Sequence, residues 1–177
     1  MDNIKHKGII IAMGTPPHVI AHCKAVADTA VTIGAALNQK GYQFDLSLLR
    51  SAGLAHDIAR IQEDHGAVAA DILQELGYQD EADIIRHHMH YPLAAHMDKL
   101  TACDLVCLAD RLVIEDQYVG LDKRFDYILH KNENQAMAKE KILQAKAQTR
   151  QLLDEMEAVL GQSIDSLFCP KQETTER

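Results

Sequence analysis

The stretch LLRSAGLAHDIAR, residues 48–60, decides how this chain is interpreted. Its apolar residues recur at helical spacing and indicate a helix that faces a core. His56 and Asp57 interrupt that pattern where it should stay buried. A buried carboxylate beside an imidazole costs free energy unless something pairs with it, and a bound cation would pair with both side chains. His-Asp pairs also arise by chance, so the dipeptide needs support from the rest of the sequence.

The composition narrows the class of protein. The chain has 177 residues, of which 47% are hydrophobic, and this suits one domain with a sizeable core. The net charge of −8 argues against a general binder of long nucleic acid or of membrane surfaces, because either would need a basic face. A phosphate substrate remains compatible with this charge, since a bound metal reverses the charge locally.

Targeting signals and cysteine pairing are not indicated. The longest apolar run, residues 8–13, is too short to span a bilayer, and no signal-peptide pattern follows it. The four cysteines lack the spacing of a metal finger. Cys103 and Cys107 lie four residues apart on an expected helix, and we interpret them as reduced core residues. We therefore expect a cytoplasmic protein.

Helical periodicity is frequent, and no convincing strand pattern is present. The expected helices cover residues 15–41, 45–60, 64–77, 80–92, 101–112, 122 onward and 134–160. Their end signals are N-caps at Asp45, Asp80 and Asp122, a Thr101–Asp104 capping box, and glycines at Gly77 and Gly161. The sequence predicts an all-α fold with one domain over residues 1–168. Its core covers about 15–118 and a C-terminal helical flank about 122–168, and a polar tail follows at 169–177.

Histidine and aspartate residues recur on separate expected helices, among small or apolar neighbours. These residues are His22, His56, Asp57, His65, His88 and Asp110. Ligands from several helices that converge on a bundle interior are a known way to build a metal site. Imidazole and carboxylate ligands with open positions suit divalent ions such as iron, manganese or zinc. The sequence therefore predicts a metal centre.

The local strings around these residues resemble the HD superfamily of metal-dependent phosphohydrolases. The strings are VIAHCKAVADTA, AGLAHDIAR, DHGAVAADIL, IIRHHMHY and LVCLADRL. The His-Gly element after the His-Asp dipeptide is similar to a branch that includes bacterial dinucleoside tetraphosphate hydrolases. The nearest resemblance is to HD domains found alone or joined to molybdenum-cofactor nucleotidyltransferase-like domains, and GLDKRFDYIL fits that group. The resemblance covers roughly residues 15–167 and implies five core helices with additional C-terminal helices.

The resemblance also implies a ligand set for one or two divalent ions, which could be Fe, Mn, Zn, Ni, Co or Mg. The core ligands of one ion would be His22, His56, Asp57 and Asp110. In dinuclear members, His65 and His88 would complete a second ion, with Asp57 as the bridge.

The adjacent pair His87-His88 leaves a choice of ligand. We prefer His88, because it stands three residues after Ile85 and matches the Ile-x-x-His pattern of the family. His87 then faces away from the metal, as one of two neighbouring side chains on a helix usually does.

The favoured function is hydrolysis of a small phosphate ester or anhydride, with a nucleotide as substrate class, through a water activated by the metal. The expected catalytic residues are Asp57, Asp110 and Arg60. Asp110 or a nearby carboxylate would accept the proton, and Arg60 would hold the phosphate one turn after His56. Weaker candidates for these auxiliary roles are Lys24, Arg86, Arg111, Asp64 and Asp71.

Two alternatives belong to other classes. One is a di-iron oxygenase of the HD type, and the other is a non-catalytic module that senses nucleotides. The expected partner is a small phosphorylated molecule, without long nucleic acid or membrane. The long C-terminal helix would serve either as a packing element or as the contact of a homodimer.

Overall fold

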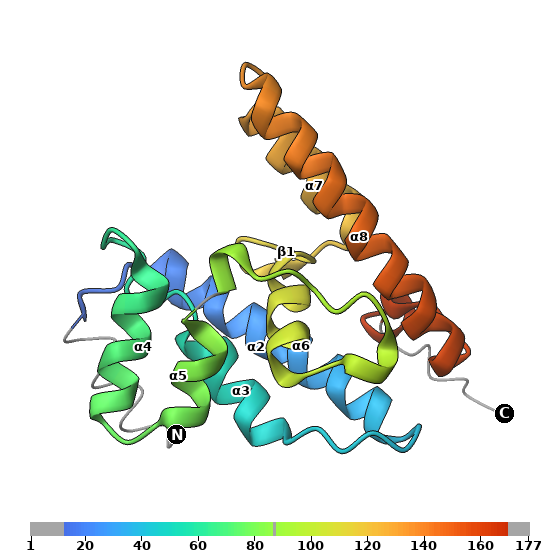
Figure 1. The fold of residues 1–177 in the computed structure, drawn as a ribbon, viewed down its shortest axis with the longest axis horizontal. Helices are drawn as coiled ribbons and strands as arrows, with labels where there is room; N and C mark the ends of the chain where they lie inside the picture. Colours follow the sequence, from blue (N-terminus) through green and yellow to red (C-terminus); the bar gives the residue numbers. More distant parts are fainter. Residues whose placement is uncertain (1–12, 87, 170–177) are drawn as a thin grey trace, which may run out of the picture.

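The computed structural model describes residues 13–86 and 88–169, and it confirms the predicted all-α fold (Figure 1). The α-helices are α2 (Pro17–Asn38), α3 (Leu46–Ala55), α4 (His65–Glu75), α5 (Gln79–Ile85), α6 (Ala102–Asp110), α7 (Leu121–Lys131) and α8 (Ala136–Leu160). The short elements are η1 (His88–His90), η2 (Met97–Lys99), η3 (Ile164–Leu167), β1 (Val113–Ile114) and β2 (Gln117–Tyr118). Predictions that concern residues 1–12, His87, the His90 side chain and residues 170–177 lie outside the described part.

Helix α2 is the centre of the bundle, and α3 and α6 pack along it. Its length and composition alone would allow it to cross a membrane. Here its apolar side chains at Val26, Ala30, Ile33 and Leu37 are fully buried against the neighbouring helices. This is the three-to-four spacing of a helix that buries one face in a protein core.

A close backbone approach joins α2 to α3. A Cβ atom at Gly53 would lie 2.6 Å from the Cα of Ala27, so only glycine fits at this crossing. The contact lies three residues before His56, and it therefore brings the end of α3 against α2. His22 lies on α2, and His56 and Asp57 follow the end of α3, so the glycine allows these three candidate ligands to lie close together.

Several predicted helix ends are confirmed. Asp45 accepts hydrogen bonds from the backbone N–H groups of Ser47 and Leu48. Thr101 and Asp104 form the reciprocal capping box at the start of α6. Gly161 ends α8 in the left-handed conformation, with a φ of 75°.

Other predicted ends are wrong. The second helix stops at Ala55 instead of Arg60, because the chain continues in tight turns such as Arg60 N–H to Asp57 C=O. The fourth helix begins at Gln79 and ends at Ile85 instead of running from Asp80 to Pro92. His56 and Asp57 therefore leave α3 at its carboxyl end, and His88 lies in η1 rather than on α5.

The sixth predicted helix, α7, begins one residue before its predicted cap. Gly120 is the N-cap residue, and Asp122 lies in the first turn. An aspartate there still favours the helix, since a negative charge stabilises the N-terminal end of the dipole.

A small hairpin was not predicted. Strands β1 and β2 pair antiparallel through Val113–Tyr118 and Ile114–Gln117. Two residues per strand are too few to show an alternating pattern, so the sequence gives no signal for them. Glu115 in the connecting turn has a φ of 52°, which is uncommon outside glycine.

Helices α7 and α8 form a helical arm that extends away from the bundle (Figure 1). The buried residues of α8 all lie in its C-terminal half, between Thr149 and Leu160. This half packs against η2 and η3. The N-terminal half projects, and the Met137 side chain near its start is 80% exposed.

Candidate metal centre

The six predicted ligands come together at one point in the bundle. They are supplied by α2 (His22), the end of α3 (His56 and Asp57), the first residue of α4 (His65), η1 (His88) and the last residue of α6 (Asp110). The Nε2 atoms of His65 and His88 lie 2.9 Å and 3.4 Å from Asp57 Oδ1. The Nε2 atom of His22 lies 3.0 Å from Asp110 Oδ1.

Backbone carbonyl groups orient three of the four imidazoles. The Nδ1–H group of His22 donates to the Glu115 carbonyl oxygen, that of His56 to Gly53, and that of His88 to Ile85. Each of these N···O distances is 2.8 Å. Because a carbonyl oxygen only accepts, the proton of each neutral ring resides on Nδ1. The lone pair on each Nε2 is therefore presented to the centre, which is the usual arrangement of a histidine that binds a metal.

The donor set fits a divalent cation. His56 Nε2 is buried and has no hydrogen-bond partner among the described residues. Burial has removed water from the lone pair on this nitrogen, and a bound ion or a proton would compensate for the lost hydration. Ligand atoms bound to one ion at about 2.1 Å lie about 3.0 Å apart in an octahedron and about 3.4 Å apart in a tetrahedron. The separations around Asp57 and Asp110 match these values.

Five of the six predicted ligands fall into two groups that share Asp57. Asp110 is in neither group and lies beside the first one, through its contact with His22. His22, His56 and Asp57 form one group, and Asp57, His65 and His88 form the other, with all atoms of a group within 4.8 Å of one another. Such a pair of groups suits two neighbouring ions with a common carboxylate. This agrees with the bridging role that the family resemblance implies for Asp57.

The electrostatics keep both carboxylates ionised. Burial opposes ionisation of Asp57, but the hydrogen bond with His88 and the nearby charge of Arg60 outweigh it and hold the pKa of Asp57 well below its usual value. Burial also opposes ionisation of Asp110. The hydrogen bond with His22 and the charge of Arg124 outweigh this effect and lower the pKa of Asp110. Both groups are therefore negatively charged near neutral pH, as metal ligands must be.

The histidines differ among themselves. Burial lowers the pKa of His56 and of His65, so these rings are neutral and ready to coordinate. For His22 and His88 burial acts in the same direction, but the hydrogen bonds with Asp110 and Asp57 prevail and raise the pKa. In the protein without metal, a proton on these two rings would take the place of the cation.

Gly66 explains the His-Gly element of the sequence. A Cβ atom at this position would lie 3.2 Å from two atoms of the His88 ring and 3.2 Å from the Ile85 carbonyl oxygen. A side chain at Gly66 would therefore displace His88. The glycine after His65 lets α4 approach the second group of ligands closely.

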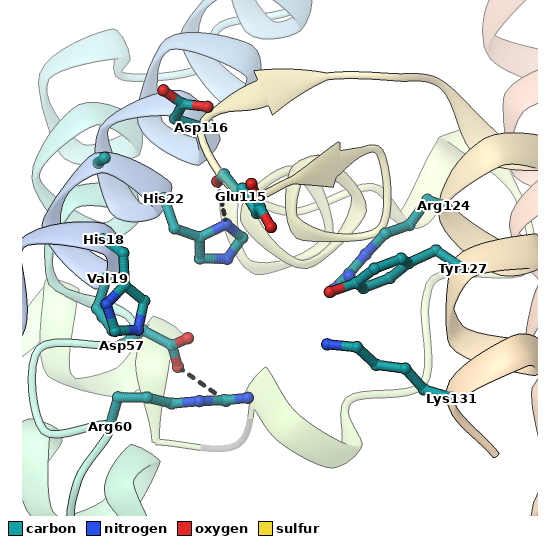
Figure 2. Close-up of a pocket in the computed structure, with 11 residues that line it drawn as sticks. His18, Val19, His22, Asp57, Arg60, Glu115, Asp116, Arg124, Tyr127 and Lys131 are labelled. Carbon is teal, nitrogen blue, oxygen red and sulfur yellow. Dashed lines mark hydrogen bonds and ion pairs between the residues drawn. The ribbon is translucent and has the colours of Figure 1, made fainter.

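An open cavity of about 540 Å³ lies over the centre (Figure 2). The α2 side and the turn after α3 contribute His18, His22, Asp57 and Arg60. The hairpin turn contributes Glu115 and Asp116, and α7 contributes Arg124, Tyr127 and Lys131. A volume of this size accommodates a small metabolite or a nucleotide.

Arg60 takes the predicted position at this cavity. Its Nη1 atom lies 3.4 Å from Asp57 Oδ1 and 3.2 Å from His65 Nε2, and half of the side chain remains exposed. The sequence alone does not predict the cavity residues of α7, although the string GLDKRFDYIL contributes to the family resemblance. Arg124 lies 3.8 Å from Asp110 Oδ1. The helical spacing of Arg124, Tyr127 and Lys131 would have placed them on one face, but nothing in the sequence indicated that this face meets the cavity.

The weaker candidates lie elsewhere or have structural contacts. Arg86 donates to Asp71 at 2.7 Å on the outer surface, and neither residue lines the cavity. Lys24 and Asp64 are exposed and also do not line it. Arg111 lines a second cavity at the centre with His88 and Asp110. Its guanidinium group also donates to the Tyr91 carbonyl oxygen and to Thr149 Oγ1, and so ties α6 to α8.

A helical bundle that gathers four imidazoles and two carboxylates under an open cavity has the donor set of a helical metal-binding protein. The HD domain family model matches residues 19–114, which include all six predicted ligands. An uncharacterized protein of Methanocaldococcus jannaschii is 32% identical over 134 residues, which cover 65% of this chain and 79% of that relative. No solved structure matches the chain. The chain belongs to the HD domain family, a superfamily of metal-dependent hydrolases that bind divalent ions.

Proposed function

We propose that the protein hydrolyses a small phosphate ester or anhydride and that its substrate is a nucleotide. The observation that carries this proposal is the pairing of a two-group metal centre with guanidinium groups on both sides of it. Arg60 lies beside Asp57 and His65, and Arg124 lies beside Asp110. Guanidinium groups in such positions suit the oxygens of a phosphoryl group better than a neutral substrate.

The residues of the site would divide the work as follows. The metal ligands would be His22, His56, Asp57, His65, His88 and Asp110. A bound divalent cation would supply an activated water and neutralise charge on the phosphoryl oxygens. Arg60 and Arg124 would bind and orient the phosphate from opposite sides. Asp110 lines the second cavity at the centre together with His22, Asp57 and His88. Asp110 or a nearby carboxylate would accept the proton that the attacking water releases.

Further expectations concern partners and location. The acidic net charge of −8 disfavours long nucleic acids, whose binding depends on the release of counterions by basic side chains. We propose a cytoplasmic enzyme that acts on small molecules and does not bind membranes. The long C-terminal helix of the arm would serve either as a packing element or as the contact of a homodimer.

The test combines metal analysis with a screen for turnover on one purified sample. We expect one or two divalent ions per chain and hydrolysis of phosphomonoesters, phosphodiesters or dinucleoside polyphosphates. Absence of turnover on the whole panel, with the metal fully loaded, would favour a nucleotide-sensing module. A mixed-valence iron signal with consumption of oxygen would favour the di-iron oxygenase. Cleavage of long nucleic acid without action on small phosphates would contradict the proposed substrate class.

A further inference from the structure

We propose that α7 carries a second anion-binding subsite, formed by Lys131 on Tyr127, and that the substrate has two anionic phosphate groups rather than one. The first group would lie at the metal centre, and the second would lie about two helical turns away along α7. This inference rests on the proposed function, because it takes phosphate as the group bound at the centre.

The first support is the placement of the residues. Arg124, Tyr127 and Lys131 are separated by three and four residues, which puts them on one face of α7. Figure 2 shows all three side chains pointing into the cavity, opposite Asp57 and Arg60. With a rise of 1.5 Å per residue, Arg124 and Lys131 lie about 10 Å apart along the helix axis. This spacing along the helix leaves room for each of the two cations to meet a separate phosphate group.

The second support is the state of the Lys131 ammonium group. Its Nζ atom lies 4.3 Å from the centroid of the Tyr127 ring. Within the described part of the chain, no carboxylate lies within ion-pair distance of it, whereas Arg124 lies near Asp110. A cation over an aromatic ring is held in place without being neutralised. Lys131 therefore presents a positioned positive charge to the cavity.

The third support is the charge of the whole cavity. Divalent cations at the centre would neutralise Asp57 and Asp110, which are the carboxylates near Arg60 and Arg124. The cations of the cavity would then outnumber the two acidic residues of the hairpin turn, Glu115 and Asp116. A phosphate at the centre would engage the two arginines. Lys131 would remain without a counterion, and the acidic turn would direct a second anion away from itself and toward α7.

The experiment compares ligands that differ by one phosphate group. Hexyl phosphate and hexanediol bisphosphate are used as their phosphonate analogues, because the proposed function includes cleavage of phosphate esters. They are titrated into the metal-loaded protein by calorimetry, and the analogue of ethanediol bisphosphate serves as a short ruler. We expect hexanediol bisphosphate to bind roughly fivefold or more tightly than hexyl phosphate, in line with one partly exposed ion pair plus two equivalent ends. The short bisphosphate cannot reach Lys131, so its gain should stay near the twofold statistical factor.

The variants locate the effect. Lys131→Gln should reduce the preference for hexanediol bisphosphate to about twofold, the statistical factor of two equal ends. Lys123→Gln removes the same charge from the same helix, but Lys123 lines a separate cavity with Asp122 and Arg150. This control should keep the full preference. Equal preference in wild type and Lys131→Gln, or an equal loss in Lys123→Gln, would overturn the subsite.

The outcomes separate the subsite from the proposed function. If hexyl phosphate binds and the longer bisphosphate gains nothing beyond the statistical factor, the subsite is wrong and the phosphohydrolase proposal stands. If neither ligand binds to the metal-loaded protein, phosphate is not the group recognised at the centre, and both proposals are wrong.

Discussion

The bundle and the helical arm hold their functional side chains in different ways. In the bundle, the His56 side chain is 1% exposed, and its ring is fixed by a hydrogen bond to the Gly53 carbonyl oxygen. In the arm, Lys131 is exposed, and its ammonium group lies over the Tyr127 ring. A rigid support suits ligands that must meet one ion, whereas an exposed face suits contacts that adapt to a substrate. The two regions should therefore respond differently to substitution.

The largest effect is expected at the carboxylate that both ligand groups share. Asp57→Ala should remove the metal and lower activity by more than about 100-fold, a loss that outer-shell partners of metal ligands already reach. Metal analysis and turnover on the same sample measure both effects. Asp71→Ala is the matched control, because Asp71 is exposed, pairs with Arg86 and does not line the cavity. Full metal occupancy in Asp57→Ala would contradict the assignment of the centre.

The next effect concerns the second ligand group. His65→Ala or His88→Ala should lower the metal content from two ions to one if the centre is dinuclear, because each removes an imidazole that faces Asp57. His87→Ala should change the content less. Loss of an ion in His87→Ala but not in His88→Ala would show that the choice between the adjacent histidines is wrong.

The bundle was more predictable from the sequence than the arm, and the reason is physical. The HD dipeptide ends an apolar run, and His22 and Asp110 each follow an alanine in an apolar stretch, so burial and chemistry point to one place. The cap signals at Asp45 and Thr101 act locally and were predicted correctly. Arg124 and Lys131 carry no such mark, because a cation on an exposed helix face is ordinary, and only the folded chain turns that face toward the cavity.

Other features depended on contacts distant in the sequence. The Glu115 carbonyl oxygen orients His22 across 93 residues, and the hairpin that presents it is too short for any periodicity. Likewise, the sequence does not distinguish Gly53 from other small residues nearby. The crossing of α2 and α3 leaves no room for a Cβ atom at this position, because it would lie 2.6 Å from the Ala27 Cα. Sequence patterns therefore predict the long helices and their capped ends, while contacts between distant residues determine the short hairpin and the close crossing of α2 and α3.

That helix crossing offers a test of rigidity in the bundle. Gly53→Ala would push the new methyl group into the backbone of α2 and should lower the free energy of unfolding by about 1–3 kcal/mol. Thermal unfolding should show a decrease in Tm of about 2–4 °C for each kcal/mol. Because the Gly53 carbonyl also orients His56, the metal affinity should fall as well. An unchanged Tm would mean that the two helices move apart without cost.

Arg60 tests the boundary between the metal ligands and the substrate contacts. Arg60→Ala should lower kcat/KM by about tenfold, the worth of one charge-assisted contact, and leave the metal content unchanged. Steady-state kinetics with metal analysis separates the two effects. Arg86→Ala removes an arginine that pairs with Asp71 away from the cavity, and it should leave both quantities as in the wild type. Loss of metal in Arg60→Ala would place Arg60 among the groups that support the ligands.

The smallest effect is expected at the start of α8 in the helical arm. Met137 is 80% exposed, so Met137→Ala removes little buried surface and should change the free energy of unfolding by less than about 0.5 kcal/mol. The same variant tests whether the arm is covered by a second copy of the chain. In that case the Met137 side chain would be buried between the two copies, and the wild-type Tm would already depend on protein concentration. The substitution would weaken the dimer and lower Tm most at low protein concentration. Denaturant unfolding at two protein concentrations distinguishes an uncovered arm from a covered one. If Met137→Ala lowers the free energy of unfolding by more than about 1 kcal/mol at the lower concentration, the start of α8 is packed against a second copy of the chain.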